Sequence, residues 1–255
     1  MKTVNILWTG GWDSTYRVLR LMDKHVSIQP YYLKDNRKSE EIELKTIEAI
    51  TEDIRNHPDS KCEILELITM NVSDVPVDVE ITKAYKNILK KDFYGSQYDW
   101  LARFSKKNKN LELCIHEDDK AVLIIKKYGN IIKEHDDLIG DYFVLDNEKS
   151  SEDLIQVFGN FHFPILTDSK LEMKEWAIHS GLIDIMNKTW FCFQPINNKP
   201  CGRCNPCIYA IEEGMEYRFS KSAMRRYRLN RIIKPVKQSG FVKRAKKILK
   251  KLRNR

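Results

Sequence analysis

The 255-residue sequence has no long apolar run, since none of its apolar stretches approaches the roughly 20 residues that a membrane-spanning helix needs. Its N-terminus enters a strand-like pattern at once, without the features of a signal peptide. It also lacks an internal repeat. We therefore expect a cytoplasmic globular protein without a transmembrane segment, long enough for one sizeable core or a core with a small appendage.

Acidic residues are missing from the C-terminal end. From Tyr217 to Arg255 the chain holds sixteen Lys and Arg and no Asp or Glu. The rest of the chain then holds 28 of the 44 basic residues against all 36 acidic ones, so the net charge of +8 hides a mildly acidic body and a strongly basic tail. A tail of this kind indicates a polyanionic partner.

Within the tail, residues 234–255, six apolar residues are spaced so that they would lie on one face of a helix. They predict an amphipathic helix over 241–252. They are Phe241, Val242, Ala245, Ile248, Leu249 and Leu252. Such a helix can bind nucleic acid, an acidic protein or, less favoured here, a membrane surface; it can also only pack its apolar stripe on the body. Phe241 is the single aromatic residue after Tyr227, which argues against a base-stacking surface in the tail.

Two common phosphate-binding motifs are also absent, the Gly-x-x-x-x-Gly-Lys-Ser/Thr loop and the Gly-x-Gly-x-x-Gly fingerprint. Instead, an apolar run ending at Trp8 leads into Thr9-Gly10-Gly11-Trp12-Asp13-Ser14, after which a helical pattern begins. Two glycines allow a tight turn and a close ligand, and the N–H groups of the following helix would face that ligand. The segment therefore predicts a phosphate site, although an ordinary strand–helix turn has the same pattern.

The remaining pattern alternates strands and helices. Strands are expected at 26–33, 62–68, 111–116 and 161–166. Helices are expected at 15–24, 39–56, 81–90, 170–180 and 208–231, and another follows a turn over 93–98 and runs to about 107. Asp168 is expected as an N-cap, and a break is expected at Pro235. We expect an α/β fold with an open parallel sheet and helices on both faces. It would comprise a domain over 1–187 with a hairpin insertion within 119–140 (strands 121–126 and 131–133), a metal-binding and helical segment over 188–233, and the tail.

Four of the six cysteines cluster as Cys192-x8-Cys201-x2-Cys204-x2-Cys207. Clustered thiols in a cytosolic chain favour a metal over disulfides, and four thiolates around one ion are typical of a closed structural zinc site. An iron–sulfur cluster also takes four cysteines and stays an alternative. Cys62 and Cys114 lie in apolar runs and are expected to be inert core residues.

The glycine segment resembles the S-G-G-x-D-S loop of the PP-loop ATP pyrophosphatases, with Thr9 in place of Ser. Together with the cysteine spacing, it makes the chain similar to a divergent 7-cyano-7-deazaguanine synthase. Further similarity lies in Phe163-Pro164-Ile165-Leu166 with Lys170 and Glu172, in Thr189-Trp190-Phe191-Cys192 and in Cys201-Gly202-Arg203-Cys204. The resemblance covers roughly residues 4–25 and 161–213.

This resemblance implies a Rossmann-like fold of the HUP type and an ATP-dependent carbon–nitrogen ligase. Thr9 to Ser14 would bind ATP, Asp13 would hold Mg²⁺, and Asp13, Ser14 and Lys170 would serve catalysis, although Lys170 could equally be a surface lysine. The four clustered cysteines would hold Zn²⁺. The substrates implied are 7-carboxy-7-deazaguanine or a relative, ATP and ammonia or another amine, and we include a homodimer among the expected assemblies.

The middle of the chain departs from that family. Its second-strand motif is replaced by Tyr32-Leu33-Lys34-Asp35-Asn36-Arg37, and the stretch that shapes its substrate site is reduced to His116-Glu117-Asp118-Asp119. We interpret this stretch as a solvated loop, and contact of its His and acidic residues with an amine or Mg²⁺ is the alternative. Three alternatives therefore stay open. The activated acid could be joined to an amine of a protein or nucleic acid, the chain could modify tRNA as a thiolase-type enzyme, or it could be a non-catalytic binding module.

Overall fold

The structure is a computed structural model that describes residues 1–238, with the backbone alone for 232–238. It divides into two compact units, Met1–Trp190 and Phe191–Arg255. The helix predicted over 241–252 lies outside the described residues. Within the described part of the chain, no helix combines the length and the apolar character that crossing a membrane requires.

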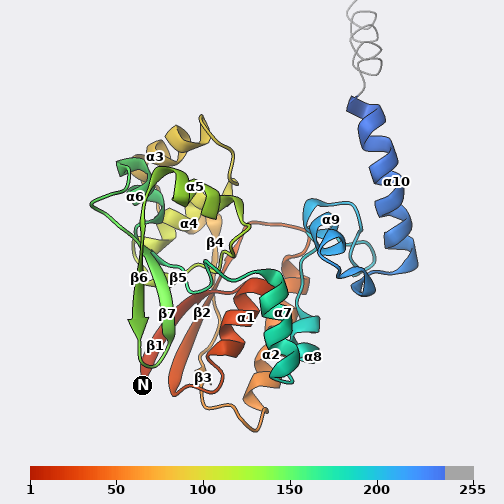
Figure 1. Ribbon diagram of the computed structural model, residues 1–255, viewed down its shortest axis with the longest axis horizontal. Coiled ribbons are helices and arrows are strands. Elements are labelled where there is room, and N and C mark those ends of the chain that lie inside the picture. The colour runs from red at the N-terminus through yellow and green to blue at the C-terminus, as the bar shows by residue number, and fades with distance from the viewer. Residues whose placement is uncertain (239–255) are drawn as a thin grey trace, which may run out of the picture. The chain divides into compact units, whose positions relative to one another are not determined.

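The first unit is built on a parallel sheet, which confirms the predicted fold class (Figure 1). Its strands are β1 (Lys2–Leu7), β2 (Val26–Lys34), β3 (Glu63–Ile64), β4 (Ile68–Asn71), β5 (Leu111–Glu112) and β8 (Phe161–His162). They run in the order β3-β2-β1-β5-β8, with β4 also paired to β2. Ile6, Val26 and Ile28 are fully buried, as expected of strands covered on both faces.

The strand predicted over 62–68 is divided into β3 and β4 because of Pro30. β2 pairs with β3 through Ser27 and Ile28 and with β4 from Tyr31 onward. The carbonyl of Ile28 accepts from the Leu65 N–H, so the backbone groups of Ile28 face β3 and β4. Every second residue of a strand faces the same neighbour, and the backbone nitrogen of Pro30 therefore also faces β3 and β4. Because proline has no N–H to donate, the hydrogen-bonded pairing is interrupted at Pro30, and β3 ends before β4 begins.

Two groups of helices pack on the sheet (Figure 1). One group contains α1 (Trp12–Arg20), α2 (Glu40–Arg55), α7 (Lys170–His179) and α8 (Ile183–Lys188); the other contains α3 (Val79–Leu89), α4 (Gln97–Ser105), α5 (Lys120–Tyr128) and α6 (Glu152–Phe158). A short 3-10 turn, η1 (Val72–Asp74), precedes α3. The second group surrounds a core of stacked aromatic rings that includes Tyr94, Tyr98 and Phe158.

The expected strand over 121–126 was wrong, because these residues form α5. Ala121, Val122, Ile124 and Ile125 are buried together, at the spacing of one helical face, and the Asp119 carboxylate caps the helix by accepting from the Ala121 N–H at 2.8 Å. The hairpin lies one element later. It consists of β6 (Ile131–Asp136) and β7 (Gly140–Leu145), paired antiparallel and bridged to the main sheet region by Phe143 and Phe163.

The second unit contains α9 (Asn205–Glu212), the 3-10 turn η2 (Glu216–Arg218) and α10 (Lys221–Gln238). The single helix predicted over 208–231 is therefore two helices, separated around Gly214, which has a φ of +80°. The predicted break at Pro235 was also wrong, since α10 continues to Gln238.

Candidate functional site

The glycine segment lies at the point where the strand order of the sheet reverses. β1 is paired with β2 on one side and β5 on the other, so the loops that follow β1 and β5 leave the sheet in opposite directions. In open α/β sheets, the crevice outside the carboxyl ends of the strands at such a point is the usual ligand site. The structure thus brings Thr9 to Ser14 to the position where the fold favours binding.

Gly10 is required by two features of the backbone. Its φ is +68°, a conformation that side chains other than glycine rarely adopt. A Cβ atom at this position would also lie 3.1 Å from Thr46 Cγ2 and 3.2 Å from the Glu43 carbonyl oxygen of α2. The turn is fixed further by the Trp190 N–H, which donates to the Gly10 carbonyl at 2.8 Å.

The first turn of α1 leaves its backbone donors without a side-chain cap. Gly11 is the N-cap, and no side chain caps the helix. The first intrahelical bond runs from the Thr15 N–H to the Gly11 carbonyl at 3.1 Å. The N–H groups before it have no acceptor within the helix, and together with the helix dipole they favour an anion.

Asp13 presents an orphaned carboxylate oxygen beside this turn. Asp13 Oδ1 is buried and accepts no hydrogen bond within the described part of the chain, and Lys170 Nζ lies 3.7 Å away. A buried carboxylate oxygen without a donor is costly, and a metal ion or a cationic group can satisfy it. Asp13 and Lys170, separated widely in sequence, are thus brought together at the same end of the sheet.

Lys170 is held in place by the start of α7. Ser169 is the N-cap, in a capping box with Glu172, and not Asp168 as the sequence predicted. Asp168 instead lies against α1, where burial raises the pKa of its carboxyl and a hydrogen bond from Tyr16 opposes that rise. This pair was not predicted, because no local signal connects Tyr16 with a residue so distant in the chain.

The segment after β5 is only partly the predicted solvated loop. His116 is only 9% exposed, and its Nδ1 accepts from the Asp118 N–H at 3.3 Å, while Asp119 caps α5. Glu117 and Asp118 are exposed. Burial raises the pKa of the Cys114 thiol well above its usual range, in agreement with an inert cysteine.

In the second unit, the four predicted cysteines converge. The Sγ atoms of Cys192, Cys201, Cys204 and Cys207 all lie within 4.8 Å of one another. Two of the distances are 3.8 Å, from Cys201 to Cys207, and 3.9 Å, from Cys192 to Cys204. A tetrahedron with Zn–S bonds of about 2.3 Å has edges of roughly 3.8 Å, so the donor set fits one zinc ion.

The backbone around the cysteines supports the same geometry. The N–H groups of Arg203 and Cys204 donate to Cys201 Sγ at 3.4 and 3.3 Å, which stabilises a negative sulfur. Gly202 has a φ of +72°, and a Cβ there would lie 2.2 Å from the carbonyl oxygen of Ala223 in α10. The glycine therefore allows the cysteine turn to pack directly on the backbone of α10.

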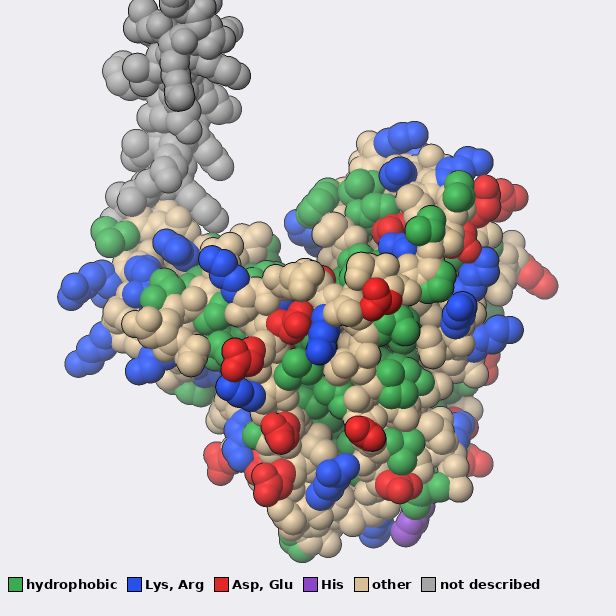
Figure 2. Space-filling view, turned by 180° about the vertical axis from the view of Figure 1, so that it is seen from behind, with side chains coloured by type: hydrophobic (Ala, Val, Ile, Leu, Met, Phe, Trp, Pro, Cys, Tyr) green, Lys and Arg blue, Asp and Glu red, His purple; other side chains and the backbone are tan. Residues whose placement is uncertain are grey.

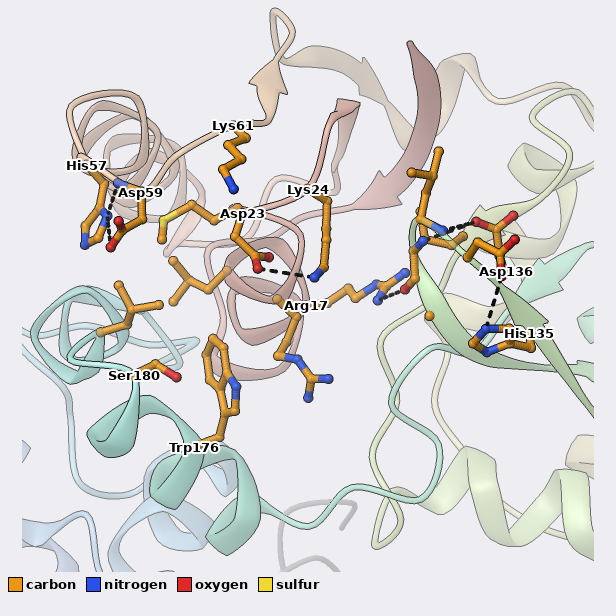
Figure 3. A pocket seen from close by; sticks show the side chains of 18 residues that line it. Arg17, Asp23, Lys24, His57, Asp59, Lys61, His135, Asp136, Trp176 and Ser180 are labelled. Atoms are coloured by element: carbon orange, nitrogen blue, oxygen red, sulfur yellow. Dashed lines mark hydrogen bonds and ion pairs between the residues drawn. The ribbon is translucent and has the colours of Figure 1, made fainter.

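A cavity of about 690 Å³ opens elsewhere in the first unit, between the end of α1, the tip of the β6–β7 hairpin and α7 (Figure 3). It lies toward the amino ends of the strands, because α1 ends there just before β2 begins. Four basic residues and four aspartates line it, and Lys24 pairs with Asp23. Its balanced charge gives no preference for an anion, so this cavity does not compete with the glycine loop as a phosphate site.

Comparisons with known proteins leave the family open. No protein-family model matches the chain, and no curated protein matches it in sequence. In structure, the chain is similar to a predicted subunit of a tRNA methyltransferase from Methanocaldococcus jannaschii, with 11% identity and a TM-score of 0.39, over 84% of this chain and 88% of that one. A similarity of this size assigns no activity to this chain.

Proposed function

We propose that this chain is an ATP-dependent ligase that cleaves ATP between its α and β phosphates to activate a carboxylate. The observation that carries the proposal is the orphaned Asp13 Oδ1, 3.7 Å from Lys170 Nζ, beside the uncapped first turn of α1. This arrangement combines an anion site with groups suited to a metal and a phosphate. Its place at the carboxyl ends of β1 and β5 fits nucleotide binding.

The proposed reaction has two steps. A carboxylate oxygen of the substrate attacks the α-phosphorus of ATP, the bond from that phosphorus to the bridging oxygen breaks, and pyrophosphate leaves with the electron pair. An amine nitrogen then attacks the carbonyl carbon of the acyl-adenylate, AMP leaves and the nitrogen loses a proton. The product is an amide.

The residues of the loop have separate roles in this proposal. The backbone N–H groups at the start of α1 would stabilise the departing pyrophosphate, with the hydroxyls of Thr9 and Ser14 as further donors. Gly10 and Gly11 would let the phosphates approach the backbone. Lys170 would neutralise charge on the same oxygens.

Asp13 would hold Mg²⁺, because this ion prefers one or two carboxylates together with phosphate oxygens. The bound ion would supply neutralisation of the phosphate charge. The cluster of four cysteines would hold Zn²⁺ in a structural role, since four protein ligands leave no open coordination position for a substrate.

We further infer that the acid is 7-carboxy-7-deazaguanine or a close relative. Support comes from the resemblance of the glycine loop, the Phe163–Leu166 segment and the cysteine segment to 7-cyano-7-deazaguanine synthases. In such an enzyme ammonia gives the amide, and a second round of ATP use dehydrates the amide to a nitrile.

The test is incubation of the purified chain with ATP, Mg²⁺, ammonium and 7-carboxy-7-deazaguanine, with AMP and pyrophosphate measured together. We expect both products in equal amounts and only when the acid is present. Release of ADP and phosphate in the first step would contradict cleavage between the α and β phosphates. AMP formed with other carboxylates, but not with this one, would keep the chemistry and reject the acid.

A further inference from the structure

The second unit presents a basic helical face that the proposed chemistry does not use. The opposite face of α10 is attached to the cysteine segment: Ala223 and Tyr227 are buried, and Arg226 Nε donates to the Cys201 carbonyl at 2.8 Å. The helix is therefore fixed on the turn that would hold the metal. The residues on its other face point to solvent.

These outward residues are Lys221, Arg225 and Arg228, which we call the basic face of α10. All three are exposed, and their spacing of four and three residues places them on one side of the helix. None of the three forms an ion pair within the described residues. Like charges at this spacing repel one another weakly, and a bound anion would relieve the repulsion.

The surroundings of the basic face are also positive. Residues 191–231 contain eight Lys and Arg and three Glu, and two of the basic residues, Lys199 and Arg203, are exposed beside the cysteines. Lys and Arg side chains outnumber Asp and Glu over this part of the surface in Figure 2. Such a patch attracts a polyanion over distances of about 10 Å at 0.1 M salt.

The type of cation favours a nucleic acid over a polymer of carboxylates. Six of the eight basic residues in 191–231 are Arg, whereas the first 190 residues contain only five Arg. Arginine forms two parallel hydrogen bonds with phosphate and carboxylate alike, but its planar guanidinium also stacks on the bases that only a nucleic acid offers. Tyr209 of α9, in the same unit, is 51% exposed. An exposed aromatic ring of this kind can stack on a base.

We propose that the second unit binds a single-stranded nucleic acid, with the basic face of α10 on its backbone phosphates and Tyr209 stacked on a base. The proposal goes beyond the ligase activity and does not depend on it. It narrows the polyanionic partner expected of the basic stretch from Tyr217 onward to a single-stranded nucleic acid, on residues that lie before the predicted helix of 241–252.

The experiment measures binding of a fluorescent oligouridylate to the full-length protein by anisotropy over a series of salt concentrations. The variant Lys221→Gln/Arg225→Gln/Arg228→Gln should bind about tenfold more weakly or worse at low salt. The salt slope for single strands is about 0.7 per neutralised phosphate, so losing three contacts should reduce the slope by about 2. Zinc content and circular dichroism of the variant should equal those of the wild type.

A matched control removes the same charge from the first unit. Lys83→Gln/Lys86→Gln/Lys90→Gln changes three exposed lysines of similar helical spacing in and after α3, and should leave affinity and slope unchanged. Tyr209→Ala should weaken binding about fivefold or more without altering the slope, because stacking releases no counterions.

Three results would overturn the proposal. Equal effects of the two triple variants would show that the basic face has no special role. Competition by polyglutamate as strong as by unlabelled oligouridylate of equal charge would assign the face to an acidic polypeptide. Tighter binding of a duplex would reject the single-stranded ligand. None of these results bears on acid-dependent AMP release, so the two proposals fail separately.

Discussion

Lys170 Nζ and Asp13 Oδ1 lie 3.7 Å apart, and each belongs to the first turn of its helix. Replacing either residue should therefore impair the same step. We expect Asp13→Asn and Lys170→Gln each to lower acid-dependent AMP formation by about 100-fold or more, because both remove charge stabilisation in a half-buried site. ATP–pyrophosphate exchange measures this step without the amine.

The control for these variants is Lys45→Gln. Lys45 is an exposed lysine of α2, and its side chain pairs only with Glu41, one helical turn away, among the described residues. It should leave the exchange rate unchanged. Full exchange activity in Lys170→Gln would make Lys170 a surface lysine and leave the proposed site without its cation.

Gly10→Ala should be more harmful than an alanine at another glycine with a similar backbone. Gly10 and Gly181 have φ values of +68° and +70°, but a Cβ at Gly181 meets nothing within 4 Å, whereas one at Gly10 meets Thr46 and Glu43. In both variants, the left-handed backbone conformation should lower the free energy of unfolding by roughly 1–2 kcal/mol. Urea unfolding should show a larger loss for Gly10→Ala, which should also weaken ATP binding. Equal losses would show that the turn tolerates a side chain.

Metal content should depend on the clustered cysteines alone. We expect one zinc per chain by elemental analysis, lost in Cys201→Ser and retained in Cys62→Ser, since Cys62 lies in the first unit. Structural zinc contributes an apparent ~10–16 kcal/mol, so chelation should expose residues 191–231 to protease before the sheet. Visible absorption from iron and sulfide would instead support the iron–sulfur alternative.

The segments that the sequence predicted well carry local signals. The strand, turn and helix around Thr9 to Ser14 are determined by residues close to one another in the sequence: the apolar run, the paired glycines and the helical period after Ser14. The spacing of the cysteines likewise determines the turn that brings them together. The predictions were wrong where a residue distant in the sequence determines the local structure. Pro30 divides a neighbouring strand, and residues 121–126 could form a strand or a helix until packing selected the helix.

The buried pair of Arg17 and Glu112 is the clearest case of a distant partner. Arg17 Nη2 and Nε lie 2.6 and 2.8 Å from the Glu112 oxygens, and Nη1 donates to the Ile139 carbonyl at 3.0 Å, which links α1, β5 and the hairpin. Burial alone would lower the pKa of Arg17, but Glu112 outweighs it and raises that pKa. Nothing near either residue in the sequence indicates this pairing, although losing one partner costs about 3–5 kcal/mol.

His162 should make stability depend on pH. It lies in β8, its ring stacks on Tyr142 of the hairpin at a centroid distance of 4.4 Å, and burial lowers its pKa below the ordinary value of about 6.5. Because the unfolded chain binds the proton more readily, this residue contributes full stability above about pH 6.5 and loses the contribution as the pH falls through its lower folded pKa.

His162→Phe keeps an aromatic ring on Tyr142 and removes the titration. The free energy of unfolding of this variant, measured by urea denaturation, should fall less between pH 7.5 and pH 5 than that of the wild type. His135 supplies a control of opposite sign, because its hydrogen bond to Asp141 raises its pKa, so His135→Gln should lose a small stabilising contribution at low pH. An identical decline in wild type and His162→Phe would show that His162 becomes protonated in the folded protein without cost, and that the stacking on Tyr142 does not depend on its charge.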